Sequence, residues 1–191
     1  PEAFEEVFWM TFSEGQKETK EKFINYVQLI NQRYKKQRYL SKNNQNIKRL
    51  ALISDIFPQS DILVPYRNPI QQAYSLHTQH QKFIEISKKN KFIAQYMRLI
   101  GHTEFGVNYV PLQNKNLFFE NHVDINHWLE QWFLVYLDCY ETLKKRKNVH
   151  FICYEQLCSQ KGYWTNILGR LDVKTPYDFD FKVSAKEISI D

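Results

Sequence analysis

Apolar residues in the first part of the chain recur at helical spacing. They repeat every three or four residues from Pro1 to Phe12, from Lys17 to Lys36 and from Asn46 to Phe57, which predicts three amphipathic helices. Pro58 follows the third of them, as expected where a helix ends. Residues 38–41 (RYLS), between the second and third helices, are a candidate for a short strand.

The rest of the chain combines two short apolar runs with further helical patterns. Residues 61–66 (DILVPY) and 149–154 (VHFICY) are largely apolar, which predicts buried strands. Helices are expected at residues 69–87, 91–100, 124–145 and 162–171, and irregular structure at 103–122 and from Val173 onward. Strands separated by helices predict an α/β fold of three layers, in which helices flank a mainly parallel central sheet. The length of 191 residues suits a single domain.

In such a sheet, ligands bind beyond the carboxyl ends of the strands. The residues at those ends in the three predicted strands are Lys42, Asn43, Arg67, Asn68, Tyr154 and Glu155. These residues are therefore the first place to look for a binding site.

The middle strand end has the features of an anion site. Asn68 is a good N-cap and Pro69 suits the first helical position, so a helix should start beside Arg67. The arginine fork and the helix dipole both favour a phosphate. Ser75, in the second turn of the helix, can turn its hydroxyl to the same anion. A surface arginine paired with a carboxylate, and a serine that fills a small gap, are also compatible with these residues.

Composition adds little to this picture. The formal net charge of +5 mildly favours anionic partners such as phosphates or nucleic acid, although a solvated Lys-rich surface accounts for it as well. No apolar run approaches the roughly 18 residues of a membrane span. The spacing of the three cysteines matches no zinc or redox motif, and we expect reduced thiols in a cytoplasmic protein.

Residues 57–76, FPQSDILVPYRNPIQQAYSL, resemble the 3'-phosphate-binding segment of sulfotransferases. In that family a strand ends in Arg-Asp-Pro or a similar sequence, and a serine follows eight residues after the arginine. Arg67 and Ser75 keep this spacing, and Asn68 replaces the usual aspartate, which is a comparable helix cap. The resemblance implies that Arg67 and Ser75 bind the donor, 3'-phosphoadenosine 5'-phosphosulfate.

Two further segments resemble the family in the same order. Residues 40–58, LSKNNQNIKRLALISDIFP, are similar to its strand, lysine and helix ending in Phe-Pro, which makes Lys42 the lysine that faces the transferred group. Residues 149–171, VHFICYEQLCSQKGYWTNILGRL, are similar to its strand ending in Tyr-Glu-x-Leu, which places Tyr154 beside the adenine. The resemblance covers about Tyr39 to Leu171 and is closest to bacterial members.

The family also implies a phosphate-loop nucleotide hydrolase-like fold and a Gly-rich loop that cradles the 5'-phosphosulfate with backbone N–H groups. The chain has five glycines, at positions 15, 101, 106, 162 and 169, and none of them forms such a loop. Either the loop and the first strand of the domain lie upstream of Pro1, or the protein is inactive.

Catalysis in this family needs a cation and a general base. Lys42 is the expected catalytic cation, and His77, which follows Ser75 on the same helix, is a candidate base. His77 and His80 share a helix face, but two ligands do not make a metal site, and we expect none.

Two other functions remain open from the sequence. A non-catalytic nucleotide- or nucleic-acid-binding protein would use the same basic strand ends. A phosphate-loop kinase would need a magnesium-binding acid at a strand end, where only Glu155 is acidic. For the leading hypothesis we expect a small-molecule or glycan acceptor with a hydroxyl or amine, and no membrane or nucleic-acid partner. The sequence predicts no oligomeric state.

Overall fold

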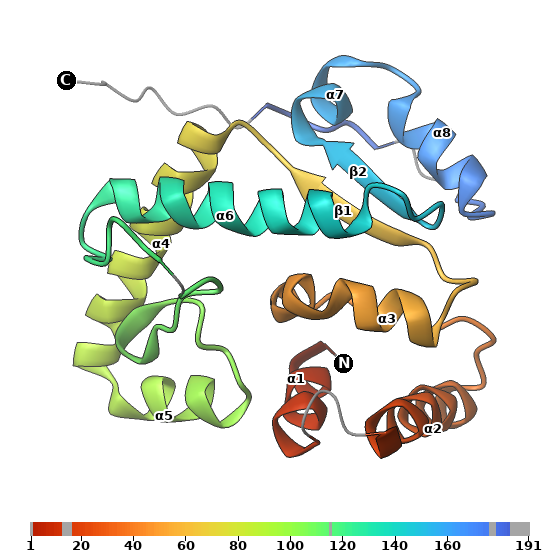
Figure 1. The fold of residues 1–191 in the computed structure, drawn as a ribbon, viewed down its shortest axis with the longest axis horizontal. Helices are drawn as coiled ribbons and strands as arrows, with labels where there is room; N and C mark the ends of the chain where they lie inside the picture. The colour runs from red at the N-terminus through yellow and green to blue at the C-terminus, as the bar shows by residue number, and fades with distance from the viewer. Residues whose placement is uncertain (1, 13–16, 115, 176–178, 184–191) are drawn as a thin grey trace. The chain divides into compact units, whose positions relative to one another are not determined.

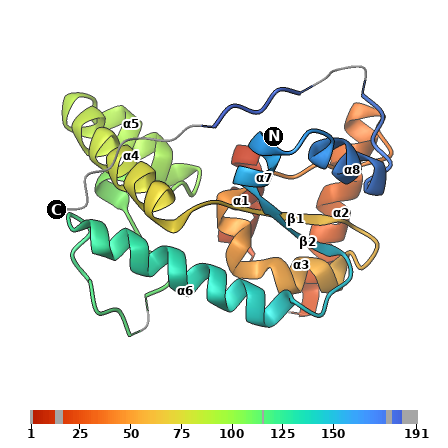
Figure 2. The same ribbon diagram turned by 90° about the horizontal axis from the view of Figure 1, so that it is seen from above.

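The computed structural model describes residues 2–12, 17–114, 116–175 and 179–183 (Figures 1 and 2). The chain divides into two compact units. Unit 1 comprises residues 1–56 and 78–115, and unit 2 comprises residues 57–77 and 116–191. Helix α4 (Pro69–Lys89) starts in unit 2 and continues into unit 1.

Unit 1 is helical. Its complete elements are α1 (Glu2–Thr11), α2 (Lys17–Tyr34), the 3₁₀ helix η1 (Asn44–Arg49), α3 (Leu50–Ile56), α5 (Lys91–Leu99) and the 3₁₀ helix η2 (Gly106–Asn108). The first two helices pack through aromatic side chains, because Phe8 and Trp9 of α1 both contact Phe23 of α2, with ring centroids 5.2 and 4.4 Å apart. All three rings are buried. The amphipathic pattern predicted for these helices is thus confirmed.

Helix α5 is bounded by a capping residue at its start and a glycine after its end. Asn90 caps its first turn by accepting a hydrogen bond from the N–H of Phe92 at 3.0 Å. Gly101 follows its end with a positive φ of 78°, which glycine adopts without steric cost. A Cβ at this position would collide with the side chains of Glu6 and Met10, so glycine also permits the close approach of α1.

Unit 2 contains a two-stranded parallel sheet. Strand β1 (Ile62–Tyr66) pairs with β2 (Val149–Cys153), and the register sets Ile62 opposite Val149 and Tyr66 opposite Cys153. Both strands were predicted, and the mixed helix-and-strand class with parallel pairing is confirmed. Among the described residues the sheet has these two strands.

The strand predicted at residues 38–41 is wrong, because these residues have neither helix nor strand. Their polar groups are bonded to side chains instead, since Tyr39 and Ser41 both donate to the carboxylate of Glu5. The helix expected from Asn46 also differs, because it begins two residues earlier as the 3₁₀ helix η1 and becomes α-helical at Leu50.

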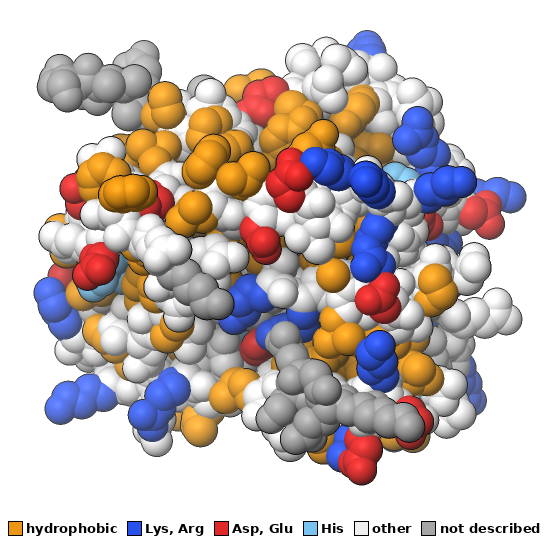
Figure 3. Space-filling model, viewed as in Figure 1, with side chains coloured by type: hydrophobic (Ala, Val, Ile, Leu, Met, Phe, Trp, Pro, Cys, Tyr) orange, Lys and Arg blue, Asp and Glu red, His pale blue; other side chains and the backbone are white. Residues whose placement is uncertain are grey.

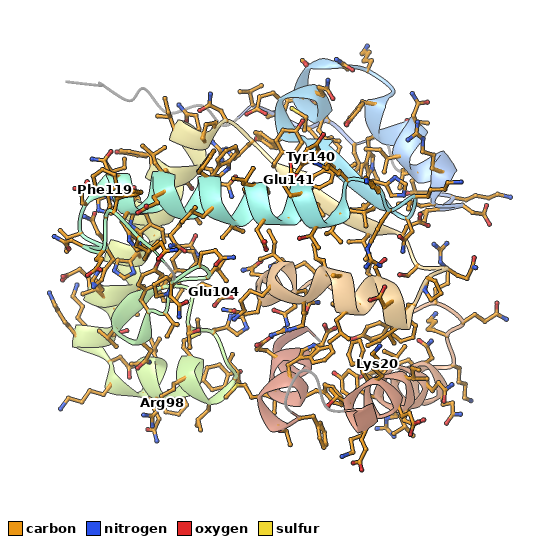
Figure 4. All side chains as sticks on the ribbon, viewed as in Figure 1. Lys20, Arg98, Glu104, Phe119, Tyr140 and Glu141 are labelled. Atoms are coloured by element: carbon orange, nitrogen blue, oxygen red, sulfur yellow. The ribbon has the colours of Figure 1, made fainter. Side chains whose placement is uncertain are left out.

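Helix α6 (Ile125–Leu143) lies along the strand pair. Asp124 caps its start by accepting from the N–H of Asn126 at 2.9 Å. Tyr136 donates to the carbonyl of Pro65 on β1 at 2.8 Å, and Tyr140 contacts Phe151 of β2 with ring centroids 5.6 Å apart (Figure 4). One face of α6 is thus joined to the sheet by polar and aromatic contacts.

Aromatic residues recur at helical spacing along α6, but they are not all buried. Trp128 is buried, whereas Phe133 is 56% exposed. Leu137 and Tyr140 are exposed on the same side of the helix, and apolar side chains gather over this part of unit 2 in Figure 3. Helical spacing alone does not distinguish a buried apolar stripe from a solvent-facing one.

Two short helices follow β2. Helix α7 (Tyr154–Ser159) begins directly after the strand, and α8 (Tyr163–Arg170) follows Gly162, which has a φ of 85°. The sequence pattern predicted α8 and missed α7, because six residues are too few to show a helical period. Tyr154 is the first residue of α7, whereas the sequence pattern predicted it as the last residue of the strand.

None of the described helices combines the length and the apolar content needed to cross a lipid bilayer. The three cysteines are free thiols, and Cys139 is buried. Burial, together with the charge of Asp138, raises the pKa of the Cys139 thiol to about 11. This thiol is therefore protonated at neutral pH and packs as a small apolar group.

Candidate functional site

Arg67 and Tyr154 lie together at the carboxyl ends of β1 and β2. The register pairs Tyr66 with Cys153, so the next residues along both strands emerge side by side. The guanidinium carbon of Arg67 lies 5.3 Å from the centre of the Tyr154 ring, which is a cation–π contact. Two of the three strand ends singled out in the sequence therefore meet, as the rule for parallel sheets predicts.

The start of α4 is the third part of this site. Asn68 caps the helix, because its side-chain oxygen accepts a hydrogen bond from the N–H of Gln71 at 3.1 Å. Pro69 is the first helical residue. Both features were predicted from the sequence. They direct the positive end of the α4 dipole to the strand ends that carry Arg67.

Glu155, which the sequence places at a strand end without a specific role, is also a member of this site. Its carboxylate accepts the backbone N–H of Asn68 at 2.8 Å and the thiol of Cys153 at 3.3 Å. The sequence places Glu155 after a strand, but its hydrogen bond with Asn68 depends on the pairing of β1 with β2. We call Arg67, Asn68, Tyr154 and Glu155 the Arg67 edge.

The electrostatics of the Arg67 edge favour a charged Glu155. Partial burial raises the pKa of this carboxyl group, but hydrogen bonds from backbone N–H groups and from Cys153, together with the charge of Arg67, outweigh burial. The pKa of Glu155 is therefore below its ordinary value. At neutral pH the carboxylate is therefore charged and lies at the start of α4, where the helix dipole favours negative charge.

Ser75 lies further along α4 and is half-buried. Six residues separate it from Pro69, which corresponds to about 9 Å along the helix axis. A single phosphate can contact both residues only if the long side chain of Arg67 extends along α4 towards Ser75. The pairing of Arg67 and Ser75 on one anion stays a prediction.

His77 is engaged by the loop that precedes α6. Its Nε2 lies 2.9 Å from the carbonyl oxygen of Val123 and donates a hydrogen bond to it. Any role as a general base would therefore fall to Nδ1. His80 is fully buried in unit 1, where its Nδ1 accepts the N–H of Gly106 at 3.2 Å. Among the described residues, no three His, Cys, Asp or Glu side chains are grouped as metal ligands.

Tyr154 is anchored at both ends of its side chain. Its ring lies against Arg67, and its hydroxyl donates to the carbonyl of Lys182 at 2.8 Å. The ring is half-buried, so part of its surface is available for stacking. An anchored aromatic ring beside a cation suits a nucleotide base with a nearby phosphate.

An aromatic pocket of about 200 Å³ lies between α6 and the strand pair. It is lined by Tyr66, Trp132, Tyr136, Tyr140 and Phe151. The polar atoms of two of these side chains are used internally, because Trp132 donates to Gln72 and Tyr136 to Pro65. The lining of the pocket is therefore mainly aromatic rings. One of its residues, Tyr66, directly precedes Arg67 in the chain.

Lys42 belongs to unit 1 and is exposed. The flanking Ser41 and Asn43 are bonded to two consecutive glutamates of α1, Glu5 and Glu6. We call residues 39–46 the Lys42 segment. Sequence reasoning missed its glutamate partners, because a Glu-Glu pair on an amphipathic helix is ordinarily solvated.

Comparisons with known proteins identified no similar protein. No family model, no curated protein and no solved structure matches the chain significantly. Of the predicted site residues, the structure brings Arg67 and Tyr154 together, places Ser75 on the helix that starts beside them, and places Lys42 in the other unit.

Proposed function

We propose that the protein is a sulfotransferase that uses 3'-phosphoadenosine 5'-phosphosulfate as sulfuryl donor. The Arg67–Tyr154 contact at the ends of two parallel strands is the observation that carries the proposal. In this proposal Arg67 and Ser75 bind the 3'-phosphate of the donor, and Tyr154 stacks on its adenine. The two strands would belong to the mainly parallel, three-layer sheet of that family.

In the proposed reaction the sulfuryl group passes directly from donor to acceptor, without a covalent bond to the protein. The acceptor oxygen or nitrogen forms a bond to sulfur while the bond between sulfur and the phosphate oxygen breaks. The products are the sulfated acceptor, adenosine 3',5'-bisphosphate and the proton of the acceptor, which passes to a base or to water. No group is oxidised or reduced. Position and charge neutralisation therefore dominate catalysis, as in phosphoryl transfer.

Each cation has a separate task in this mechanism. Arg67 contacts a phosphate that does not react, so its contribution is the same in the ground and transition states. Lys42 stabilises the sulfuryl oxygens and the leaving phosphate, where negative charge develops. The acceptor is a small molecule or glycan with a hydroxyl or amine group. His77 is the candidate base and would act through Nδ1.

Sulfuryl transfer from labelled donor tests the function. The protein is incubated with the ³⁵S-labelled donor and a panel of phenols, alcohols, amines and sugars, with a chelator present. We expect label in an acceptor product. The matched donor without the 3'-phosphate, adenosine 5'-phosphosulfate, should be used much less efficiently. Equal use of both donors would contradict a 3'-phosphate site at Arg67 and Ser75. Transfer of phosphate from ATP that a chelator abolishes would instead indicate a kinase-like function.

A further inference from the structure

We propose that Glu5 and Glu6 are positioning residues for Lys42. Their carboxylates hold the residues on both sides of Lys42, so that its ammonium group is presented in one place. The inference rests on the proposed sulfotransferase function, in which Lys42 faces the transferred group. The glutamates act through Lys42 and do not touch the reacting atoms.

The part of the Lys42 segment that precedes η1, which includes Lys42, has no regular backbone structure to fix its shape. Residues 38–43 lie between α2 and η1 and form neither helix nor strand. A segment of this kind has many accessible conformations, and ordering it has an entropic cost that other contacts must offset. A lysine on a free segment would also sample many positions, because its own side chain is long and flexible.

Glu5 supplies the first set of compensating contacts. It is fully buried on α1, and its carboxylate accepts hydrogen bonds from the hydroxyl of Ser41 at 2.6 Å, the hydroxyl of Tyr39 at 2.7 Å and the amide of Asn46 at 2.7 Å. Burial, with the Glu5 hydrogen bond next in size, raises the pKa of Tyr39 far above its ordinary value. The phenol therefore remains a donor at every accessible pH.

Glu6 supplies the second set. Its carboxylate is held by both terminal nitrogens of Arg49, at 2.7 and 3.0 Å, and accepts the side-chain amide of Asn43 at 2.8 Å. Burial raises the pKa of Glu6, but the bonds from Arg49 and Asn43 and the charge of Arg49 outweigh it and lower the pKa overall. The Glu6 carboxylate is therefore charged at neutral pH and can keep its bonds to Arg49 and Asn43.

The two carboxylates are consecutive on α1, so they diverge by about 100° around the helix axis. Ser41 is bonded to one of them and Asn43 to the other, and Lys42 lies between these two fixed neighbours with an exposed side chain. Here the partners flank the one lysine assigned to catalysis, and a small misplacement of a catalytic group lowers the rate strongly.

The first test measures the position of Lys42 directly. Loss of a glutamate would leave several buried donors unpaired, so the variant is Ser41→Ala combined with Asn43→Ala, which leaves the Arg49 and Tyr39 bonds in place. We expect the backbone ¹⁵N order parameter of Lys42 to fall from about 0.8 or more to about 0.6 or less. Asn90→Ala, which removes the cap of α5 in the same unit, is the stability-matched control and should leave Lys42 ordered.

The second test measures coupling to catalysis. In the otherwise wild-type protein, Ser41→Ala with Asn43→Ala should lower kcat of donor turnover about tenfold at unchanged donor KM, and Ser41→Thr should retain activity. In the Lys42→Ala background the same pair should lower kcat by less than about twofold, because a positioning effect vanishes with the positioned group. A merely structural role would lower kcat equally in both backgrounds.

The outcomes separate this inference from the proposed function. In one outcome, the wild-type protein transfers no sulfuryl group while the order parameter of Lys42 still falls in the Ser41→Ala/Asn43→Ala variant. That result would contradict the proposed function and support the positioning of Lys42 by Glu5 and Glu6. If the order parameter of Lys42 is unchanged in the variant, or the kinetic effects are additive, Glu5 and Glu6 do not position Lys42. Either of these last two results overturns the inference.

Discussion

The Arg67 edge of unit 2 and the Lys42 segment of unit 1 each present a cation, but they are built in different ways. Arg67 stands beside Tyr154 because two parallel strands are in register and a capped helix starts there. The Lys42 segment has no strand or helix at its centre and is held by side-chain bonds to buried carboxylates. Backbone pairing shapes the first region, and side-chain chemistry shapes the second.

This difference predicts different sensitivities. A parallel ladder shares its hydrogen bonds among many backbone groups, so no single side chain decides the geometry of the Arg67 edge. A network of buried side chains depends on each member, because an unsatisfied buried charge is expensive. Single substitutions and acid should therefore perturb the Lys42 segment more than the Arg67 edge.

The largest expected effect is on stability, from Arg49→Met. Arg49 and Glu6 form a buried ion pair, with 3% and 9% of their side chains exposed. Removal of one partner leaves an uncompensated buried charge, which should lower the free energy of unfolding by about 3–5 kcal/mol. Urea unfolding measures this loss. In contrast, Lys22→Met breaks the exposed pair with Glu18 and should cost at most about 1 kcal/mol. Similar losses in both variants would contradict the special status of the buried network.

The next largest effect separates the two cations kinetically. Lys42→Ala should lower kcat by about 10²–10³-fold, the range for loss of one preorganised donor, with little change in donor KM. Arg67→Ala should raise donor KM with a smaller effect on kcat, because it contacts a group that does not react. Steady-state kinetics with a saturating acceptor measures both. A near wild-type kcat for Lys42→Ala would identify Lys42 as a surface charge.

A smaller effect is expected at the helix start of the Arg67 edge. Asn68→Ala removes the cap on the Gln71 N–H and should destabilise the protein by about 1 kcal/mol. Asn68→Asp keeps an acceptor and serves as the control. If Asn68→Ala cost as much as Arg49→Met, the Arg67 edge would depend on single side chains in the same way as the Lys42 segment.

The smallest expected effect is on the pH dependence of stability. The pKa of Glu6 lies below its ordinary value of 4.5, because the Arg49 and Asn43 bonds outweigh burial. Its contribution to folding is thus fully present above the unfolded pKa and is lost as pH falls through the folded pKa. The free energy of unfolding should drop from pH 7 to about pH 3.5 by more in the wild-type protein than in the Glu6→Met/Arg49→Met double variant. An identical drop in both would contradict the assignment.

The sequence predicted the regions that backbone periodicity controls. Both strands, the Asn68 cap, the Pro69 start and most helices follow from local patterns, and parallel pairing then brings Arg67 to Tyr154. The Lys42 segment was predicted wrongly, because RYLS has the residue types of a strand, but its hydroxyls bond to Glu5. No local pattern reveals that two charged residues on a distant helix are buried.

The helix of six residues after β2 and the exposure of Phe133 do not follow from local patterns, for related reasons. Helical periodicity can be detected in a sequence only over more than two turns. In addition, a stripe of apolar residues does not by itself identify which face of a helix is buried. The role of Glu155 at the helix start became visible only when β1 and β2 were brought into register.

The most direct test of the central claim is calorimetry of nucleotide binding to the Arg67 edge. Adenosine 3',5'-bisphosphate should bind more tightly than adenosine 5'-monophosphate, because only the former offers a 3'-phosphate to Arg67 and Ser75. Arg67→Ala should remove about 1.5–3 kcal/mol of binding free energy for the bisphosphate, as for a charge-assisted hydrogen bond, and little for the monophosphate. Equal affinity of the wild-type protein for the two nucleotides would contradict a 3'-phosphate site and, with it, the proposed sulfotransferase.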